Sequence, residues 1–303
     1  MAAVVVRGLH KHYGSNRAVD GIDLDVEEGE VFAMLGPNGA GKTTTVEILE
    51  GHRTRSGGEV SVLGHDPETG GRDLRERIGI VLQSSGIEKE FTPRELLNVY
   101  APMFPHTLPI DRIIEVTGLS EKADARIKTL SGGQMRRVDL ALGLIGDPEL
   151  IFLDEPTTGF DPSARRRSWD LVDNLRSLGK TILLTTHYMD EAQSLADRVA
   201  VIVKGNIVAE GTPDTLGGRQ QAEATISFVA DQSLLGELPD GLRAMAAADE
   251  GSITLRTASP TEVLHALTGW AVGRGLELDA ISVVRPSLED VYLQLTDGEA
   301  ADE

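Results

Sequence analysis

A glycine-rich loop between an apolar run and a helix-forming stretch most constrains what this chain can fold into. The loop reads Gly36-Pro37-Asn38-Gly39-Ala40-Gly41-Lys42-Thr43-Thr44. We predict a buried strand at 31–35 before it and a helix at 42–49 after it. Glycines allow several backbone N–H groups to point inward at the start of a helix, where the helix dipole also favours an anion. Residues 36–43, called the phosphate loop below, therefore predict a site for the phosphates of a nucleotide.

The composition limits the classes of partner. A formal net charge of -19 argues against nucleic acid, because binding to a phosphate backbone needs a dense basic face. The absence of cysteine excludes disulfides and thiolate metal sites and fits a cytoplasmic protein. The first residues are too briefly apolar for a signal sequence, and no apolar run approaches the roughly 20 residues of a spanning helix. A membrane-spanning part would have to come from another chain.

A second helix start also has the features of an anion site. Between residues 84 and 150 the strand signal fades, and we predict a helical insert with helices at 93–100, 110–117 and 133–145. Thr92 is the predicted N-cap of the first, with Pro93 at its first helical position. The last of these follows Leu130-Ser131-Gly132-Gly133-Gln134, called the serine-glycine loop below. One interpretation is a helix capped by Ser131 and nothing more. The other is a second phosphate-binding helix start, far along the chain from the first.

Several polar side chains stand at the ends of predicted buried strands. The strand at 149–154 runs into the adjacent carboxylates Asp154 and Glu155, which are costly to bury without a role. Asp154 is suited to support Mg²⁺, and Glu155 to accept a proton from water. The strands at 78–83 and 181–187 end in Gln83 and His187, where α/β sheets contact ligands. His187 could equally be structural.

Two other features allow more than one interpretation. Tyr13, at a bend before the phosphate loop, is either a packing residue or a platform on which a base stacks. A predicted helix at 161–178 has Trp169, Val172, Leu175 and Leu178 spaced for a core face, with Gly179 as its stop. Arg165 to Arg167 lie in the same helix, and we interpret this run as a solvated face.

The composition changes after a glycine- and proline-containing boundary at 211–218. We predict strands at 224–229, 252–256 and 276–284 and helices at 261–272 and 288–295, which form a small α+β domain over 220–296. Residues 297–303 form an acidic tail.

Taken together, these motifs resemble the ABC-transporter ATPase family. The phosphate loop, Gln83, the serine-glycine loop, the Asp154-Glu155 strand and His187 occur in that family's order over roughly residues 3–215. Leu-Ser-Gly-Gly-Gln is the diagnostic part. The stretch 286–293 is similar to the tail motif of the daunorubicin-resistance type of drug-efflux ATPases. The resemblance implies an α/β fold: a P-loop ATPase core over 1–215 with an N-terminal antiparallel β subdomain and a helical subdomain at 84–150, plus the small C-terminal domain.

The resemblance also implies how the two loops work. In the family, each ATP lies between the phosphate loop of one subunit and the serine-glycine loop of another, which implies a homodimer with two composite sites. The implied nucleotide-binding residues are Tyr13 against adenine, then Gly36, Pro37, Asn38, Gly39, Ala40, Gly41, Lys42, Thr43 and Thr44. The residues implied to act in trans are Ser131, Gly132, Gly133 and Gln134.

The resemblance further implies an active ATPase, because every chemical residue is present. Glu155 would be the general base, His187 would contact the γ-phosphate and hold the water, and Lys42 would bind the β- and γ-phosphates. The residues implied at Mg²⁺ are Thr43, Gln83 and Asp154, and Gln83 is also implied to act in catalysis by sensing both the metal and the attacking water.

The expected function is the motor of an exporter of drug-like or other small amphipathic molecules. A separate transmembrane permease subunit would be its partner, with this chain cytoplasmic and peripheral on the inner face of the cell membrane. The alternatives are an importer ATPase and a soluble ABC ATPase without a transport role. The C-terminal domain would brace the dimer or shield the catalytic face, or alternatively sense a ligand.

Overall fold

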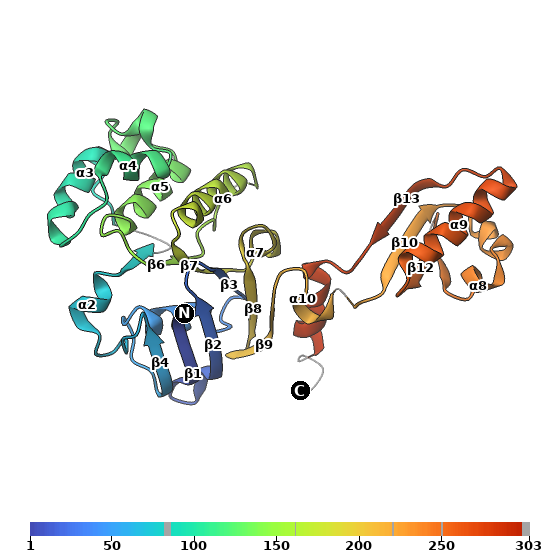
Figure 1. Ribbon diagram of the computed structural model, residues 1–303, viewed down its shortest axis with the longest axis horizontal. Coiled ribbons are helices and arrows are strands. Elements are labelled where there is room, and N and C mark those ends of the chain that lie inside the picture. The colour runs from blue at the N-terminus through green and yellow to red at the C-terminus, as the bar shows by residue number, and fades with distance from the viewer. Residues whose placement is uncertain (82–85, 161, 220, 250, 299–303) are drawn as a thin grey trace. The chain divides into compact units, whose positions relative to one another are not determined.

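The computed structural model describes residues 1–81, 86–160, 162–219, 221–249 and 251–298. The chain divides into two compact units, Met1–Pro213 and a second that begins at Asp214. Each unit has its own hydrophobic core and is described separately. Figure 1 labels the elements of both.

A six-stranded sheet forms the centre of the first unit, in the order β5-β6-β7-β3-β8-β9. Neighbours from β5 to β8 run parallel, and β9 is antiparallel to β8. The predicted apolar runs become its strands because parallel strands are buried on both faces. The strands are β3 (Val31–Leu35), β5 (Ile78–Val81), β6 (Leu150–Asp154), β7 (Thr181–Thr186), β8 (Arg198–Val203) and β9 (Asn206–Gly211).

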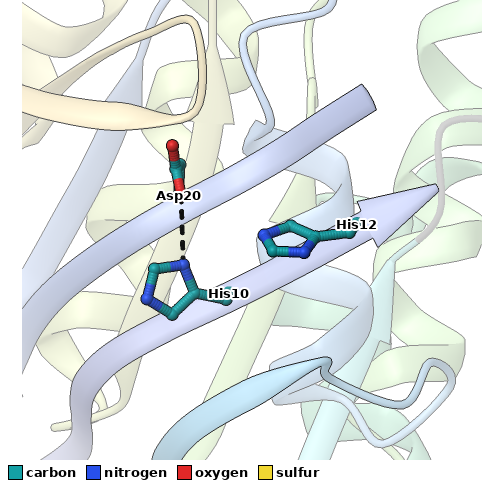
Figure 2. Close-up of side chains that lie close together, drawn as sticks. All are labelled: His10, His12 and Asp20. Atoms are coloured by element: carbon teal, nitrogen blue, oxygen red, sulfur yellow. Dashed lines mark hydrogen bonds and ion pairs between the residues drawn. The ribbon is translucent and has the colours of Figure 1, made fainter. Parts of the chain in front are cut away.

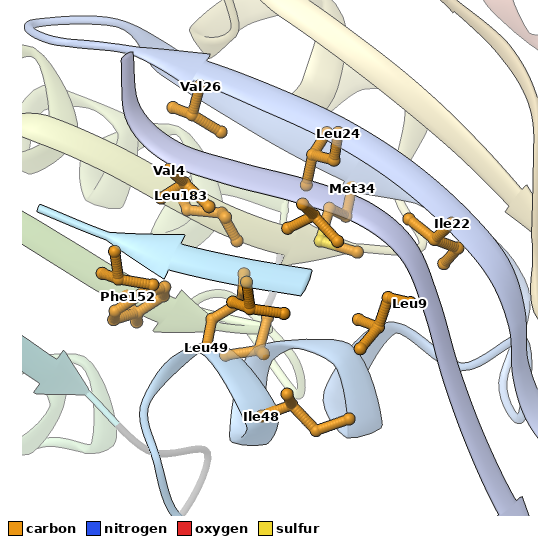
Figure 3. Packing of buried hydrophobic residues seen from close by; sticks show 14 of the residues in the cluster. Val4, Leu9, Ile22, Leu24, Val26, Met34, Ile48, Leu49, Phe152 and Leu183 are labelled. Atoms are coloured by element: carbon orange, nitrogen blue, oxygen red, sulfur yellow. The ribbon is translucent and has the colours of Figure 1, made fainter. Parts of the chain in front are cut away.

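A three-stranded antiparallel sheet, in the order β2-β1-β4, packs over this sheet and α1 (Lys42–Leu49). Its strands are β1 (Ala2–Tyr13), β2 (Asn16–Glu27) and β4 (Gly57–Val62). Figure 3 shows Leu9 and Leu24 of the antiparallel sheet in one cluster with Met34 of the central sheet and Ile48 of α1. The hairpin of β1 and β2 is longer than the strands at 3–9 and 22–26 that the sequence predicts, because its polar distal part still pairs across the strands as far as Tyr13 and Asn16.

Helices α3 (Pro93–Tyr100), α4 (Ile110–Val116) and α5 (Gly132–Gly143) make up the predicted helical insert. They lie together in Figure 1. Both α3 and α5 begin with a capping box, in which Thr92 pairs with Glu95 and Ser131 pairs with Gln134. The predicted caps Thr92 and Ser131 are thereby confirmed.

The remaining helices of the first unit are α2 (Gly71–Arg75), α6 (Pro162–Ser177) and α7 (Met189–Leu195). The predicted core residues Val172 and Leu175 of α6 are buried. Gly179 follows α6 with a φ of 74°, in the left-handed region that suits a glycine after a helix.

The second unit contains an antiparallel sheet in the order β11-β12-β10-β13, with its core centred on Phe228, Leu255 and Leu267. The strands are β10 (Ala224–Val229), β11 (Ala246–Asp249), β12 (Ser252–Thr257) and β13 (Asp279–Val284). The helices are α8 (Asp240–Arg243), α9 (Pro260–Arg274) and α10 (Leu288–Gly298). The sequence did not predict β11, whose Ala-Ala-Ala-Asp has low strand propensity and is held by pairing with β12.

Within the described ranges, no helix combines the length and the apolar composition that crossing a membrane requires.

Candidate active site

The phosphate loop is packed too tightly to accept side chains at two of its glycines. A Cβ atom at Gly36 would lie 2.4 Å from the carbonyl oxygen of Ile202, and one at Gly41 would lie 2.4 Å from that of Ala18. Gly41 also has a φ of 107°, which L side chains rarely adopt. These glycines hold the loop against β8 and β2, and α1 begins immediately after it.

Lys42 lies inside the mouth of this loop. Its Nζ donates to the carbonyl oxygens of Gly36 at 2.8 Å and Pro37 at 3.1 Å, and the residue is only 4% exposed. Burial lowers the pKa of the ammonium group, and the nearby Glu155 carboxylate partly opposes this effect. A buried cation at a helix N-terminus is suited to bind an anion that replaces its carbonyl partners.

Thr43 and Asp154 bring two oxygen donors together across the loop. The Thr43 hydroxyl lies 3.4 Å from Asp154 Oδ1. The same carboxylate oxygen accepts a hydrogen bond of 2.6 Å from the Thr185 hydroxyl on the neighbouring strand β7. Hydroxyl and carboxylate oxygens form the donor set that Mg²⁺ prefers, together with phosphate oxygens and water. The residues present therefore fit a magnesium ion.

Glu155 contacts both Lys42 and His187. Its Oε1 lies 3.7 Å from Lys42 Nζ and 3.3 Å from His187 Nδ1, while Oε2 accepts a hydrogen bond from the Thr158 hydroxyl at 2.9 Å. Burial raises the pKa of this carboxyl, but the Thr158 hydrogen bond and the His187 and Lys42 charges outweigh it, so the pKa is lowered. Glu155 is therefore ionised at neutral pH and able to accept a proton.

The backbone at Glu155 is held in a special conformation. Its φ of 43° lies in the left-handed region, which is sparsely populated by residues other than glycine. The Glu155 N–H donates to the Thr185 hydroxyl at 3.0 Å. The Thr185 hydroxyl thus fixes both carboxylate residues: it donates to the Asp154 side chain and accepts from the Glu155 backbone.

Three contributors to the site were not singled out from the sequence: Thr158, Thr185 and Arg136. Arg136 on α5 donates to the backbone carbonyls of Asp154 and Pro156, which ties the helical insert to the acidic strand end. Two threonines at the end of an apolar strand were the available signal for Thr185. Thr158 and Arg136 depend on contacts that only the fold reveals.

The prediction that Arg165 belongs to a solvated face is wrong. Its side chain is 14% exposed, and its guanidinium carbon lies 3.6 Å from the ring centroid of Tyr188. A terminal nitrogen of the same guanidinium group binds the Asp190 carboxylate. The Tyr188 ring in turn lies 4.0 Å from that of His187. Arg165 therefore belongs to the group that surrounds His187, whereas Arg166 is exposed as expected.

A cavity of about 290 Å³ opens beside the phosphate loop. It is lined by Tyr13, Asn16, Ala18, Asn38, Gly39, Gly41, Lys42, Thr43, Thr44 and Glu155. The Tyr13 ring is 42% exposed, with Lys11 Nζ at 5.1 Å and the Arg53 guanidinium carbon at 5.5 Å from its centroid. Tyr13 is thus partly open to solvent at this cavity, which is compatible with the stacking interpretation.

The serine-glycine loop lines a separate cavity of about 620 Å³. Ser131 is exposed, and its Oγ accepts the Gln134 N–H, while the Gln134 side chain accepts the Ser131 N–H. The N–H groups of Gly132 and Gly133 occupy the first helical turn, where the helix itself supplies no partner. The two cavities have no lining residue in common.

The predicted sensor residue Gln83 lies outside the described residues. Among the others, the structure brings Lys42, Thr43, Asp154, Glu155 and His187 together. The serine-glycine loop lies mainly on a different cavity, although its Gly132 and Glu155 both line a further one.

Comparison with known proteins decides the family. The ABC transporter family matches residues 19–158, and a family described as "ABC transporter domain-containing protein-like, C-terminal domain" matches residues 224–287. The daunorubicin/doxorubicin resistance ATP-binding protein DrrA of Streptomyces peucetius is 37% identical, over 99% of this chain and 94% of its own length. This chain belongs to the ABC transporter ATP-binding family. The Nod factor export ATP-binding protein I of Rhizobium meliloti is 39% identical to this ABC protein, over 99% of this chain and 90% of its own length.

Solved structures confirm the predicted ABC cassette fold. The structure of cbiO1 from Clostridium perfringens, described as part of the ABC transporter complex cbiONQ, has a TM-score of 0.63 and 29% identity. It covers 70% of this chain and 89% of its own. An ATP-binding cassette solved in its ADP conformation also has a TM-score of 0.63, with 27% identity, over 70% of this chain and 91% of its own. The chain is an ABC ATPase that binds and hydrolyses ATP.

Proposed function

We propose that this ABC ATPase drives an exporter whose membrane-spanning part is a separate permease chain. The observation that carries this proposal is that relatives named for daunorubicin resistance and for Nod factor export align over nearly the whole chain, C-terminal domain included. The described helices, none of which could span a membrane, are consistent with a separate membrane partner. The transported molecule would be drug-like or otherwise small and amphipathic. The subunit would be cytoplasmic, peripheral on the inner face of the cell membrane.

We further propose that two copies of the chain pair head to tail. The cavity beside the phosphate loop holds the charged side chains Lys42 and Glu155, whereas the one beside the serine-glycine loop offers Ser131 and the amides of Gly132 and Gly133. Each cavity supplies part of what a triphosphate requires, and their lining residues do not overlap. Pairing would bring the serine-glycine loop of one subunit to the nucleotide of the other.

In this composite site, the loop amides and Lys42 would neutralise the β- and γ-phosphates, and Tyr13 would stack on adenine. Thr43 and Asp154 would hold Mg²⁺, and the family resemblance assigns Gln83 a role in sensing the ion; the ion would supply charge neutralisation when bound. Ser131, whose hydroxyl hydrogen remains available to a phosphate oxygen, would act in trans with Gly132 and Gly133. Gln134 would position Ser131 through the capping box, which refines its predicted role.

Glu155 would accept the proton of the attacking water, and His187 would hold both the water and the γ-phosphate. The contact between His187 Nδ1 and Glu155 Oε1 at 3.3 Å supports this pairing. Thr158 would keep the second carboxylate oxygen oriented. Phosphoryl transfer to water depends chiefly on such positioning and on charge neutralisation.

Glu155→Gln tests the catalytic assignment. The substitution keeps the size of the side chain and removes the base, so we expect ATP turnover to fall about 10³-fold while ATP binding persists. It should also trap an ATP-bound dimer that is visible by size-exclusion chromatography. Near-normal turnover would refute the role of Glu155, and a chain that remains monomeric with bound ATP would refute the composite dimer.

Transport direction needs a separate experiment. Trapped Glu155→Gln protein, incubated with detergent-solubilised membranes of its own cell, should co-purify with a polytopic membrane protein. Inverted membrane vesicles that contain both chains should then take up daunorubicin or a related amphipathic compound on addition of ATP. ATP-dependent uptake only in right-side-out vesicles would identify an importer. Failure to recover any membrane protein would favour a role outside transport.

A further inference from the structure

Three metal-ligating side chains gather on the β1–β2 hairpin, outside the ATP site. His10 and His12 lie on β1, and Asp20 lies on β2 as the cross-strand partner of His10. Each offers one ligand atom, and these three atoms lie within 4.8 Å of one another. Figure 2 shows Asp20 and His12 on adjacent sides of the His10 ring.

The separations approach those of a coordinated ion. Zinc bonds of 2.0–2.1 Å in a tetrahedron place two ligand atoms about 3.3 Å apart. His10 Nδ1 and Asp20 Oδ1 are already 3.2 Å apart. His12 is the third ligand of the set: its ligand atom lies within 4.8 Å of the other two, its ring lies edge-on to that of His10 at a centroid distance of 5.8 Å, and its side chain is exposed.

The backbone that carries these residues is held on both sides. The N–H of His12 donates to the Ser56 hydroxyl at 3.0 Å, and the carbonyl of His10 accepts from the Ser56 N–H at 2.8 Å. Arg17 binds Asp20 Oδ2 at 3.1 Å, which orients the carboxylate and leaves Oδ1 facing His10. Such support by neighbouring groups is typical of metal ligands, although the Arg17 charge also weakens attraction for a cation.

We propose that His10, His12 and Asp20 bind a divalent transition-metal ion of the zinc class, with solvent completing the coordination. Two imidazoles and one carboxylate suit zinc, cobalt and nickel, and they disfavour magnesium and calcium, which require oxygen ligands. The site is distinct from the residues proposed for Mg²⁺ at the phosphate loop. It does not depend on the proposed export function.

The simpler explanation is a cross-strand pair between His10 and Asp20 with His12 nearby by chance. A chain with a net charge of -19 also attracts cations without a built site. A convincing test must therefore separate specific ligation from surface binding. The chain offers two matched controls, the exposed histidines His106 and His265, which belong to other parts of the chain.

The test uses the full, untagged chain without nucleotide or Mg²⁺, titrated with Co²⁺ alone and followed by absorption in the visible range. We expect one site per chain whose d–d bands indicate nitrogen ligation, and Zn²⁺ should displace the Co²⁺. His12→Ala and Asp20→Asn should weaken binding at least about tenfold, because loss of a ligand costs no less than loss of its supporting contacts. His106→Ala and His265→Ala should bind as the wild type does.

Equal affinity in the wild type and His12→Ala would overturn the proposal, as would a wild-type spectrum without nitrogen ligation. Circular dichroism checks the folding of each variant. If His10→Ala fails to fold, His12→Ala at the exposed position still tests whether the site binds metal. The NMR shifts of the His10 ring nitrogens on addition of Zn²⁺ provide an independent measurement. None of these measurements depends on ATPase activity, so a negative result for metal binding would not contradict the proposed function.

Discussion

The starts of α1 and α5 look alike in sequence, because each places glycines at the mouth of a helix, yet they are built differently. At α1 the N-cap is Gly41, which has no side chain, and the charged Lys42 is buried in the first turn. At α5 the N-cap is Ser131, which is exposed and closed into a capping box with Gln134. The phosphate loop therefore encloses a buried charge, whereas the serine-glycine loop pairs only Ser131 and Gln134 within itself and carries no charged side chain of its own.

The neighbours of the two loops differ in the same way. Asp154, Glu155 and His187 surround the first, so a triphosphate there would meet its cation, its base and its metal ligands within one subunit. The second offers backbone amides and the Ser131 hydroxyl, with Arg137 lining the same cavity. On the function proposed above, the phosphate loop would supply the chemistry and the serine-glycine loop would complete the site from the other subunit, and the predictions below separate the two contributions.

Lys42→Ala should have the largest effect. Removing the buried ammonium group leaves the β- and γ-phosphates without their fixed cation, so ATP hydrolysis should fall about 10³-fold or more and ATP binding should weaken as well. Steady-state phosphate release and binding of a fluorescent ATP analogue measure the two quantities. Lys180→Ala removes a lysine that pairs with Asp147 and should leave both unchanged. Tight ATP binding by the Lys42 variant would contradict the assignment.

Ser131→Arg should separate hydrolysis from binding. The added bulk and charge block the second loop, so ATPase activity should fall about 10²-fold, the scale of losing one transition-state donor. The affinity of a monomeric chain for ATP should not change, because Ser131 lies in the other cavity. Ser120→Arg introduces the same change at another exposed serine of the helical insert and serves as the control. An equal loss of ATP affinity in the Ser131 variant would mean that both loops act within one chain.

Much of this architecture could be predicted from the sequence because local signals coincide with the fold. Apolar runs identified the parallel strands, and the Thr92 and Ser131 caps located the starts of two helices. The hairpin of β1 and β2 was predicted too short because its distal residues are polar, and pairing rather than burial makes them strand.

The polar contacts within the candidate site were harder to predict from the sequence. Thr185 holds Asp154 only because β6 and β7 pair in a register that places these residues opposite each other. Arg165 lies in a charged run, and its contact with the Tyr188 ring depends on how α6 and α7 pack. Sequence patterns report local preference and burial, whereas these contacts depend on neighbours far away along the chain.

A buried ionisable residue, Glu50, also lies at the C-terminal end of α1. Glu50 follows the helix at 4% exposure, with Oε2 3.2 Å from His52 Nδ1. Burial raises its pKa from 4.5 to about 8, and the nearby Asp154 and Glu47 charges add to the effect. Between these two values the unfolded chain binds fewer protons than the folded one, so the free energy of unfolding falls as pH rises and levels off above pH 8.

Glu50→Gln should remove this pH dependence. At neutral pH the variant should be more stable than the wild type by about 3 kcal/mol, at about 1.4 kcal/mol for each pH unit above 4.5, and the advantage should shrink toward pH 5. Urea unfolding at several pH values measures the effect. Glu59→Gln, at an exposed glutamate of β4, should change little. If the free energy of unfolding changed with pH equally in the Glu50 variant and the wild type, a group other than Glu50 would be responsible for the pH dependence.

Thr185→Val should give the smallest effect, and it tests how the acidic strand end is held. The substitution keeps the shape of the side chain but removes the donor to Asp154 and the acceptor of the Glu155 N–H. A buried N–H without a partner costs about 1–3 kcal/mol, and the left-handed conformation of Glu155 loses its restraint. We expect kcat to fall about tenfold, with little change in ATP affinity, because the lost contact positions the base rather than the phosphates. Thr181→Val, at the start of the same strand, removes a hydroxyl that accepts the Gly29 N–H. The Thr181 variant should lose a comparable amount of stability and keep its kcat. An equal fall in kcat in the Thr181 and Thr185 variants would show that Thr185 contributes to stability alone.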